Sequence, residues 1–276
     1  MGKTITTYLI DGNPQGVRSI FIDNKICKLL LIPRSELDIV NKRAELKSPA
    51  FYILLGEDEN QLPKAYLGET ENFADRIKHH DNKKDFWQRA LVFISNDSSL
   101  HKANVQYLEH LAVVLAHQTK RYNTDENKQI PKAPNLPEHI QSSTEEFFED
   151  VKLLTSFVGC LIFEKIEQKG KTIFHLKSRG IEAKGFYDEN GFTVLKGSTV
   201  NPDNVPSFIW PDKRNKLLQE LAEQQGNKLV LHTDNTFSSP STACDFCSGS
   251  SQNGWIVWKT AKGHTLDEVY RNKLNS

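Results

Sequence analysis

Residues 49–122 of this chain contain five side chains whose types suit the hydrolysis of a phosphodiester bond. They are Tyr52, Tyr66, Arg76, His80 and Glu109. That reaction needs an activated water, a positive charge that stabilises the anionic transition state, and a group that stabilises the leaving alkoxide. A single glutamate is a natural anchor for Mg²⁺, which keeps most of its waters and takes its other ligands from substrate phosphate. A guanidinium offers a planar fork of donors to the phosphate oxygens.

Each of these residues has a candidate role in that chemistry. Glu109 is the expected metal ligand, and Arg76 is expected to bind the phosphate. Tyr52 is the candidate general base, although the ordinary tyrosine pKa of about 10 means that nearby positive charge must stabilise its phenolate. Arg76 or a metal hydrate would supply that charge. Tyr66 and His80 would then relay or orient the proton.

The apolar patterning places these side chains on a hairpin and two helices. The expected order is strand 50–56, strand 65–68, helix 73–80, strand 86–94 and helix 98–118. Arg76 and His80 are four residues apart, so they share one face of the first helix. Glu109 lies on the long helix, away from its apolar stripe, and Lys102 lies two turns before it on the same side.

This arrangement resembles the GIY-YIG nuclease family. The two motifs that give the family its name appear as Ala50-Phe51-Tyr52 and Tyr66-Leu67-Gly68. Arg76, His80 and Glu109 match the positions of the family's helix arginine, the tyrosine or histidine one turn later, and the metal-binding glutamate. The late asparagine of the family falls near Asn123 or Asn127. The first motif departs from the pattern, because Ala50 replaces its glycine and Phe51 takes the middle place.

The resemblance implies a Mg²⁺-dependent (or Mn²⁺-dependent) endonuclease that acts on DNA. The net charge of the chain is zero, so a nucleic-acid site requires a local concentration of basic residues. Residues 76–89 provide one, with His79 and His80 beside it. The residues expected to bind nucleic acid are Lys78, Lys83, Lys84, Arg89 and Lys102.

Each of these side chains also has a purely structural interpretation. Tyr52 and Tyr66 could form a cross-strand aromatic pair, and Glu109 could pair with Lys102. Two rival functions therefore remain open. One is a non-catalytic nucleic-acid-binding module, and the other is a protein–protein adaptor that acts through the C-terminal domain.

The whole sequence is typical of an α+β protein with two folded parts. We expect a β-rich N-terminal leader at 1–48, a nuclease-like module at 49–122, a linker at 123–140 and an accessory α+β domain at 141–276. The linker is predicted from Pro131, Pro134 and Pro137, because proline at that density disfavours helix and sheet interiors. A helix is expected at 35–45 in the leader, after three short strands.

Residues 178–270 resemble an uncharacterised domain that often follows GIY-YIG modules in bacterial proteins. The resemblance rests on motifs such as Gly191-Phe192-Thr193-Val194 and Asn253-Gly254-Trp255. Within this part, a helix is expected at 213–225 and a strand at 254–258. The domain could be a DNA clamp or a structural, partner-docking module, and both interpretations remain open. The clamp would use Lys196, Lys213, Arg214 and Lys216.

The cysteines and the hydropathy indicate a cytoplasmic protein. Cys244 and Cys247 have the spacing of zinc ligands, but no second pair is present to complete a tetrahedral site. Four cysteines in 276 residues do not form a disulfide framework, which favours a reducing compartment. No apolar run approaches the roughly 20 residues that a membrane span requires, so no membrane partner is expected.

Overall fold

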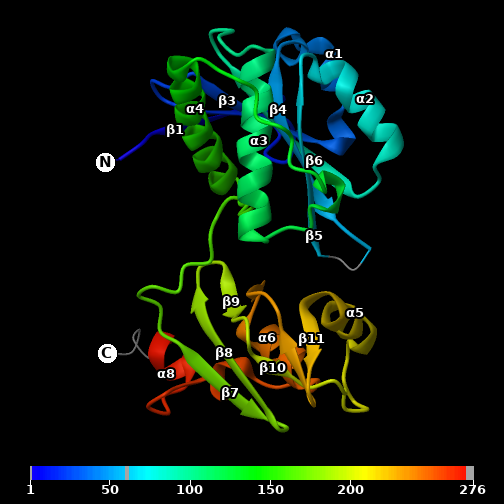
Figure 1. Cartoon of the computed structure of the whole chain (residues 1–276), viewed down its shortest axis with the longest axis vertical. Coiled ribbons are helices and arrows are strands. Elements are labelled where there is room, and N and C mark those ends of the chain that lie inside the picture. The colour runs from blue at the N-terminus through cyan, green and yellow to red at the C-terminus, as the bar shows by residue number, and fades with distance from the viewer. Residues whose placement is uncertain (1, 60–61, 272–276) are drawn as a thin grey trace. The chain divides into compact units, whose positions relative to one another are not determined.

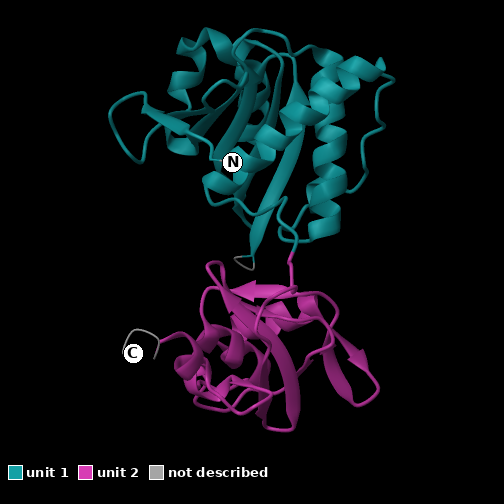
Figure 2. Cartoon of the chain, turned by 90° about the vertical axis from the view of Figure 1, so that its left-hand side faces the viewer, with its two compact units in different colours: residues 1–165 teal, residues 166–276 magenta. Residues whose placement is uncertain are grey.

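The structure is a computed structural model that describes residues 2–59 and 62–271. The chain divides into two compact units, Met1–Lys165 and Ile166–Ser276 (Figure 2). Both contain antiparallel sheets and helices, so the α+β class predicted from the sequence is confirmed.

Unit 1 is built on a six-stranded antiparallel sheet with the order β1-β2-β3-β6-β4-β5. Its strands are β1 Ile5–Leu9, β2 Arg18–Ile22, β3 Cys27–Pro33, β4 Ala50–Glu57, β5 Pro63–Thr70 and β6 Trp87–Ser95. The three strands of the N-terminal leader therefore extend the sheet of the module predicted at 49–122, because β3 pairs with β6 along its whole length. The leader and the module share one sheet.

Helices cover both faces of this sheet (Figure 1). α2 (Phe73–Lys83) packs on one face, while α3 (Lys102–Thr119) and α4 (Glu138–Phe157) pack on the other. The sheet has a hydrophobic core on each face, and the side chains of β4 alternate between them. Phe51 packs in the core beneath α3 and α4, whereas Tyr52 packs in the core beneath α2. A strand buried on both faces appears in the sequence as a continuous apolar run, as residues 50–55 do.

The single helix expected at 35–45 is absent. Short pieces replace it: η1 (Arg34–Glu36), α1 (Asp38–Lys42) and η2 (Ala44–Lys47). Val40 and Leu46 are both buried in the hydrophobic core between the sheet and α2. Residues six apart do not share a face of one helix, so the chain must change direction to bury both.

The linker predicted at 123–140 is instead part of unit 1. The backbone of Asn123 pairs with β5, accepting from Ala65 N at 2.9 Å and donating to Pro63 O at 2.8 Å. A 3-10 turn, η3 (Asp125–Asn127), follows. α4 then buries Phe147, Val151 and other apolar residues in the same core as α3. The division between units lies after Lys165, because these apolar side chains tie α4 to the sheet.

Unit 2 contains two antiparallel sheets. The five-stranded sheet has the order β13-β9-β8-β7-β14, and the three-stranded sheet has the order β10-β12-β11. The strands are β7 Phe174–Ser178, β8 Ile181–Asp188, β9 Gly191–Val194, β10 Thr199–Val200, β11 Ala222–Gln225, β12 Lys228–Leu231, β13 Asn235–Phe237 and β14 Lys259–Thr260. The helices are α5 Pro211–Leu221, α6 Pro240–Ser248, α7 Gly254–Val257 and α8 Leu266–Tyr270.

Two elements of unit 2 differ from the sequence prediction. The helix expected at 213–225 ends at Leu221, and its last residues form β11. The strand expected at 254–258 is the short helix α7, capped by the Asn253 side chain, which accepts from Trp255 N. A Cβ at Gly254 would lie 2.2 Å from the Pro240 carbonyl carbon, so close packing of α7 on α6 sets the local conformation.

Several residues singled out in the sequence are buried within unit 2. Cys244 and Cys247 are both buried on α6. Arg214 is fully buried, and its guanidinium donates to Phe246 O, Asn201 O and Asn204 Oδ1. It is therefore a structural bridge and cannot contribute to a DNA clamp on the surface.

Within the described part of the chain, no helix is both long enough and apolar enough to span a membrane.

Candidate functional site

The hairpin β4–β5 brings the two motif tyrosines onto one side of the sheet. Tyr52 is directly opposite Gly68 in the register, and the rings of Tyr52 and Tyr66 lie 6.1 Å apart. A Cβ at Gly68 would be 2.5 Å from Tyr52 Oη. The glycine of the second motif is therefore required because the hydroxyl of Tyr52 occupies the space of its missing side chain.

α2 places Arg76 and His80 against that hydroxyl. The helix begins after Asn72, whose side chain accepts from Asp75 N, and it buries Phe73 and Ile77 on the sheet. Arg76 Nε donates to Tyr52 Oη at 3.2 Å. His80 Nε2 lies 2.7 Å from the same oxygen. The shared helix face expected from the spacing of Arg76 and His80 thus converges on one phenol.

The hydrogen-bond geometry assigns a direction to the proton on Tyr52. Arg76 can only donate, so Tyr52 Oη accepts from it and can donate its own proton to His80 Nε2. That assignment needs a neutral imidazole. Burial, aided by the charges of Arg76 and Lys84, lowers the pKa of His80 to about 4, which keeps the ring neutral. Its other nitrogen, Nδ1, is buried with no hydrogen-bond partner among the described residues.

Burial opposes ionisation of Tyr52 in this arrangement. The side chain is fully buried, and this burial raises the pKa of Tyr52 well above its ordinary value. The neighbouring Tyr66 raises that pKa further, while the hydrogen bond and charge of Arg76 lower it. Tyr52 is therefore a protonated phenol at rest, and any phenolate depends on Arg76 for charge.

Glu109 reaches this region from the other face of the sheet. It lies on α3, which packs against β5, the edge strand. Its carboxyl group is half-buried, and burial followed by the nearby charge of Glu69 raises the pKa of Glu109 to about 7. Arg76 and Lys102 act on that pKa in the opposite direction. The carboxyl therefore lies within electrostatic reach of both cations around the edge of the sheet.

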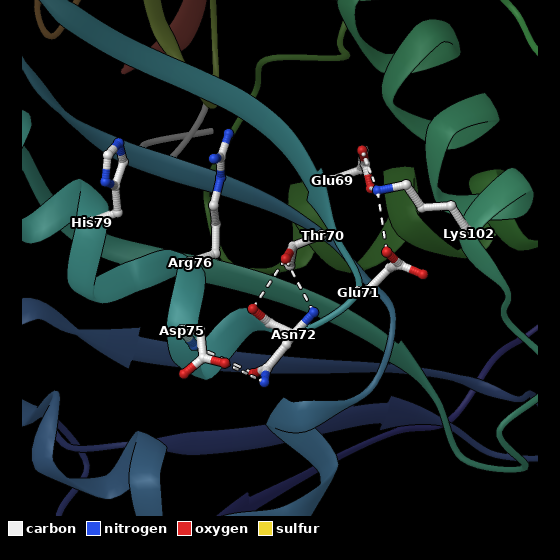
Figure 3. A pocket seen from close by; sticks show the side chains of 8 residues that line it. All are labelled: Glu69, Thr70, Glu71, Asn72, Asp75, Arg76, His79 and Lys102. Carbon is white, nitrogen blue, oxygen red and sulfur yellow. Dashed lines mark hydrogen bonds and ion pairs between the residues drawn. The ribbon is translucent and has the colours of Figure 1, made fainter.

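Adjoining hollows connect these side chains on the surface. One hollow lies between the end of β5 and α2 and is lined by Glu69, Arg76 and Lys102 among others (Figure 3). A second is lined by Glu69, Glu109 and residues 131–135. A third is lined by Tyr66, Glu109 and residues 125–129. Glu69 lines the first two hollows and Glu109 lines the last two, so the three hollows adjoin one another, and we refer to them together as the depression.

The five predicted residues thus lie close together, three of them at the surface and two of them buried behind. Arg76, Tyr66 and Glu109 line the depression. Tyr52 and His80 are buried behind Arg76 and Tyr66, and the rings of Tyr66 and His80 lie 5.1 Å apart.

The structure also adds residues that the sequence interpretation missed or left open. Asn127 lines the depression with Glu109, and its buried amide donates to Leu67 O at 2.8 Å and accepts from Leu67 N at 2.9 Å. The Asn123 side chain instead donates to Asp58, at 3.2 Å. The Asn127 side chain therefore forms hydrogen bonds with both backbone groups of Leu67 on the edge strand β5, beside the site. Glu69, directly after the second motif, was missed because a single glutamate in a polar turn carries no signal of its own.

The residues expected to bind nucleic acid have varied surroundings. Lys102 Nζ lies 3.1 Å from Glu69 and 3.8 Å from Glu71, as Figure 3 shows. Lys84 pairs with Glu126 and lies 4.3 Å above the ring of Tyr66. The other three are Lys78, which pairs with Asp75 at 3.9 Å, Lys83, which is exposed at the end of α2, and Arg89.

The structure does not bring Arg89 to the depression. Arg89 is on β6, opposite Leu55 in register, and it shares the face of Leu91, which packs under α3 and α4. The separation follows from the topology, because the four residues between Lys84 and Arg89 cross from the helix to β6, which is two places from the β5 edge of the sheet.

A metal ion at this site would be held by few protein ligands. Among residues 2–59 and 62–271, no group of three or more His, Cys, Asp and Glu side chains is arranged to hold a metal. The carboxyl of Glu109, with that of Glu69 close enough to raise its pKa, is the candidate donor pair among the carboxylates that line the depression. This set suits Mg²⁺, which is commonly bound through one or two carboxylates, water and substrate phosphate.

Comparison with known proteins bears on unit 2 alone. Residues 174–270 match a domain of unknown function, DUF4357. The matched residues lie entirely within unit 2 and cover less than half of the chain. No curated protein and no solved structure matches the chain.

Proposed function

We propose that unit 1 is a metal-dependent nuclease of the GIY-YIG type that hydrolyses phosphodiester bonds in DNA. The observation that supports this proposal is that Arg76, Tyr66 and Glu109 line the adjoining hollows of the depression, in front of the hydrogen-bonded pair of Tyr52 and His80. An anion-binding guanidinium and a metal-binding carboxylate thereby lie at neighbouring positions on the surface, with a buried phenol–imidazole pair behind them.

Arg76 is suited to bind the scissile phosphate. Its guanidinium is held in place by Tyr52 and forms no ion pair with a carboxylate among the described residues. It therefore remains a full positive charge at the depression. A planar guanidinium fixed by a buried partner loses little freedom when it binds a phosphate oxygen.

Tyr52 and His80 are the proposed proton-transfer pair, and Tyr52 is the candidate general base. His80 Nε2 accepts from the Tyr52 hydroxyl and so orients its proton. Arg76 donates to the same oxygen and would stabilise its phenolate. Because Tyr52 is fully buried, this role requires the site to open so that the attacking water reaches the hydroxyl.

Glu109 would hold Mg²⁺ or Mn²⁺ in this nuclease. The ion would polarise a phosphate oxygen and lower the pKa of a bound water. Glu109 fits that role because its half-buried carboxyl, beside Glu69, has unfavourable surroundings for an uncompensated negative charge, which a divalent cation relieves.

The test compares cleavage with binding in the full chain. Glu109→Gln keeps the shape of the side chain but removes the charge that anchors the metal, so we expect plasmid nicking in Mg²⁺ to fall at least about a hundredfold. DNA binding measured in EDTA should stay level or rise slightly. Arg76→Ala should lose both nicking and some affinity, since Arg76 contacts phosphate before and during the reaction.

Glu138→Gln is the matched control, because it makes the same charge change at an exposed position on α4. Wild-type nicking by the Glu109→Gln protein would remove Glu109 from the metal site. Binding without nicking by the wild type, in Mg²⁺ and Mn²⁺ and on several DNA forms, would favour a non-catalytic nucleic-acid-binding module. Neither binding nor nicking would favour a protein–protein adaptor that acts through the C-terminal domain.

A further inference from the structure

The five-stranded sheet of unit 2 has one apolar face and one charged face. α6 packs against the apolar face, where Phe246 contacts Phe237 at 4.9 Å between ring centroids. Trp258 covers Phe192 on the same side at 4.3 Å. Side chains alternate along each strand, so the neighbours of these residues point the other way.

On that other face, basic side chains are aligned across adjacent strands. Lys259 of β14 is opposite His175 of β7, and His175 is opposite Lys184 of β8. The two lysines are exposed and the histidine is half-buried. Neighbouring strands are about 4.8 Å apart, so the row presents a basic group at each strand.

More lysines surround Glu182, which lies beside this row. Lys177 is opposite Glu182 in the register, and its Nζ lies 3.0 Å from the carboxylate. The hydrogen bond and charge of Lys177, with the charges of Lys228 and Lys184, lower the pKa of Glu182. The charge of Lys259 acts on Glu268 of α8 instead. The four lysines therefore outnumber the two carboxylates near them.

We propose that the exposed face of β14, β7 and β8, with Lys259, His175, Lys184 and Lys177, binds the phosphate backbone of duplex DNA. Exposed lysines on neighbouring strands suit contacts with backbone phosphates, which need no base recognition. Duplex DNA is favoured over single strands, because platforms for single strands stack bases on exposed aromatic rings, whereas this row is made of lysine and histidine. The inference concerns unit 2 and is independent of catalysis in unit 1.

The experiment measures binding of a fluorescent random-sequence DNA duplex to the full chain, in EDTA and over a range of salt concentrations. The triple variant Lys177→Gln, Lys184→Gln, Lys259→Gln should bind at least about tenfold more weakly at low salt. The slope of log affinity against log salt should fall by about two to three, since each phosphate contact contributes about 0.9.

A second triple variant, Lys42→Gln, Lys47→Gln, Lys169→Gln, removes the same charge at exposed positions outside the row and should bind like the wild type. Cooperative thermal melting of both variants shows that they are folded. Equal loss in the two triple variants, or no loss in the first, overturns the proposal. So does tighter binding to single-stranded DNA, to RNA or to anionic lipid vesicles through the same lysines.

The outcome is separable from that of the nuclease proposal. Arg76→Ala and Glu109→Gln proteins should still show the loss caused by the triple lysine substitution, since the row is in unit 2. A protein that never nicks DNA but shows this loss retains the inference. Nicking that depends on Glu109, with no effect of the lysines, rejects the inference alone.

Discussion

The hydroxyl of Tyr52 is confined by three neighbours, and each of them has a different chemical effect. Arg76 donates to it, His80 can accept its proton, and the absence of a side chain at Gly68 gives it space. A buried phenol held this closely cannot shift without breaking one of these contacts, so the catalytic geometry proposed here depends on a residue that performs no chemistry.

Gly68→Ala tests that dependence. The added Cβ would lie 2.5 Å from Oη and 2.6 Å from Cζ of Tyr52, so the ring must move away from His80. We expect a loss of about 1–3 kcal/mol in the free energy of unfolding, typical of overpacking, and at least about tenfold slower nicking. Denaturant unfolding and a plasmid nicking time course measure the two effects.

The companion variant is Tyr52→Phe, which removes the closest atom. In the wild-type background it leaves Arg76 and His80 without their partner and should be destabilising. Combined with Gly68→Ala it should cost less than the sum of the two changes, because the missing oxygen relieves part of the collision while Cζ, 2.6 Å from the added Cβ, remains. Strict additivity of the two changes would show that the hydroxyl and the glycine do not interact.

The carboxyl of Glu109 gives a second test at the residue scale, without any activity assay. Its pKa rises from an ordinary 4.5 to about 7 in the folded protein. The folded state therefore binds more protons than the unfolded chain between these two values, and wild-type stability falls as the pH rises through this window. Glu109→Gln has no such penalty, so its stability relative to wild type should increase from about pH 4.5 to about pH 7 and then level off.

Denaturant midpoints of both proteins, measured in EDTA across this range, give the difference directly. Other titrating groups cancel in the comparison. Mg²⁺ added at about pH 8 should stabilise the wild type but not the Glu109→Gln protein, as expected for a ligand that binds only the folded state. A difference that does not change with pH would contradict a raised pKa at Glu109.

At the scale of elements, α4 decides where the first unit ends. Phe147, Phe148, Val151 and Leu154 are buried among residues of α3 and the sheet. Thr119 Oγ1 donates to Ile162 O beyond the helix, which fixes the following turn as well. The segment that joins α3 to α4 also forms one wall of the depression around Glu109.

Truncation tests this assignment. A chain that ends at residue 124 loses the four buried apolar side chains of α4, each contributing about 1.5–3 kcal/mol, and the buried Cys160, Ile162 and Phe163 beyond it. The total is comparable to the whole stability of a typical domain, about 5–15 kcal/mol. We expect residues 1–124 to lack a cooperative thermal transition by circular dichroism, whereas residues 1–165 should melt cooperatively. A well-folded 1–124 fragment would restore the boundary predicted at the prolines.

At the scale of the whole molecule, charge is balanced but unevenly distributed. Basic and acidic residues number 35 each, so the chain has no net long-range attraction for nucleic acid. In unit 1, Lys102 and Lys84 are paired with Glu69 and Glu126. In unit 2, the row across β14, β7 and β8 has few counter-charges. Binding of a polyanion would therefore depend on these local surfaces and on low ionic strength.

The matched domain at 174–270 also agrees with a boundary after Lys165 better than with one near residue 140. The prolines at 131, 134 and 137 disfavour regular structure, but they do not prevent a segment from packing in an extended form against a hollow. Proline content predicts local conformation, whereas the unit boundary depends on which side chains are buried.

The sequence by itself determined the order of hairpin, helix, strand and helix at 50–119, because the periods of apolar residues are local signals. It also determined that Arg76 and His80 share a helix face. Only the tertiary structure decided that the leader strands join the same sheet, that Lys102 is paired with Glu69, and that Arg214 is buried. These features depend on contacts between residues far apart in the chain, and no local period records which distant side chain will be the partner.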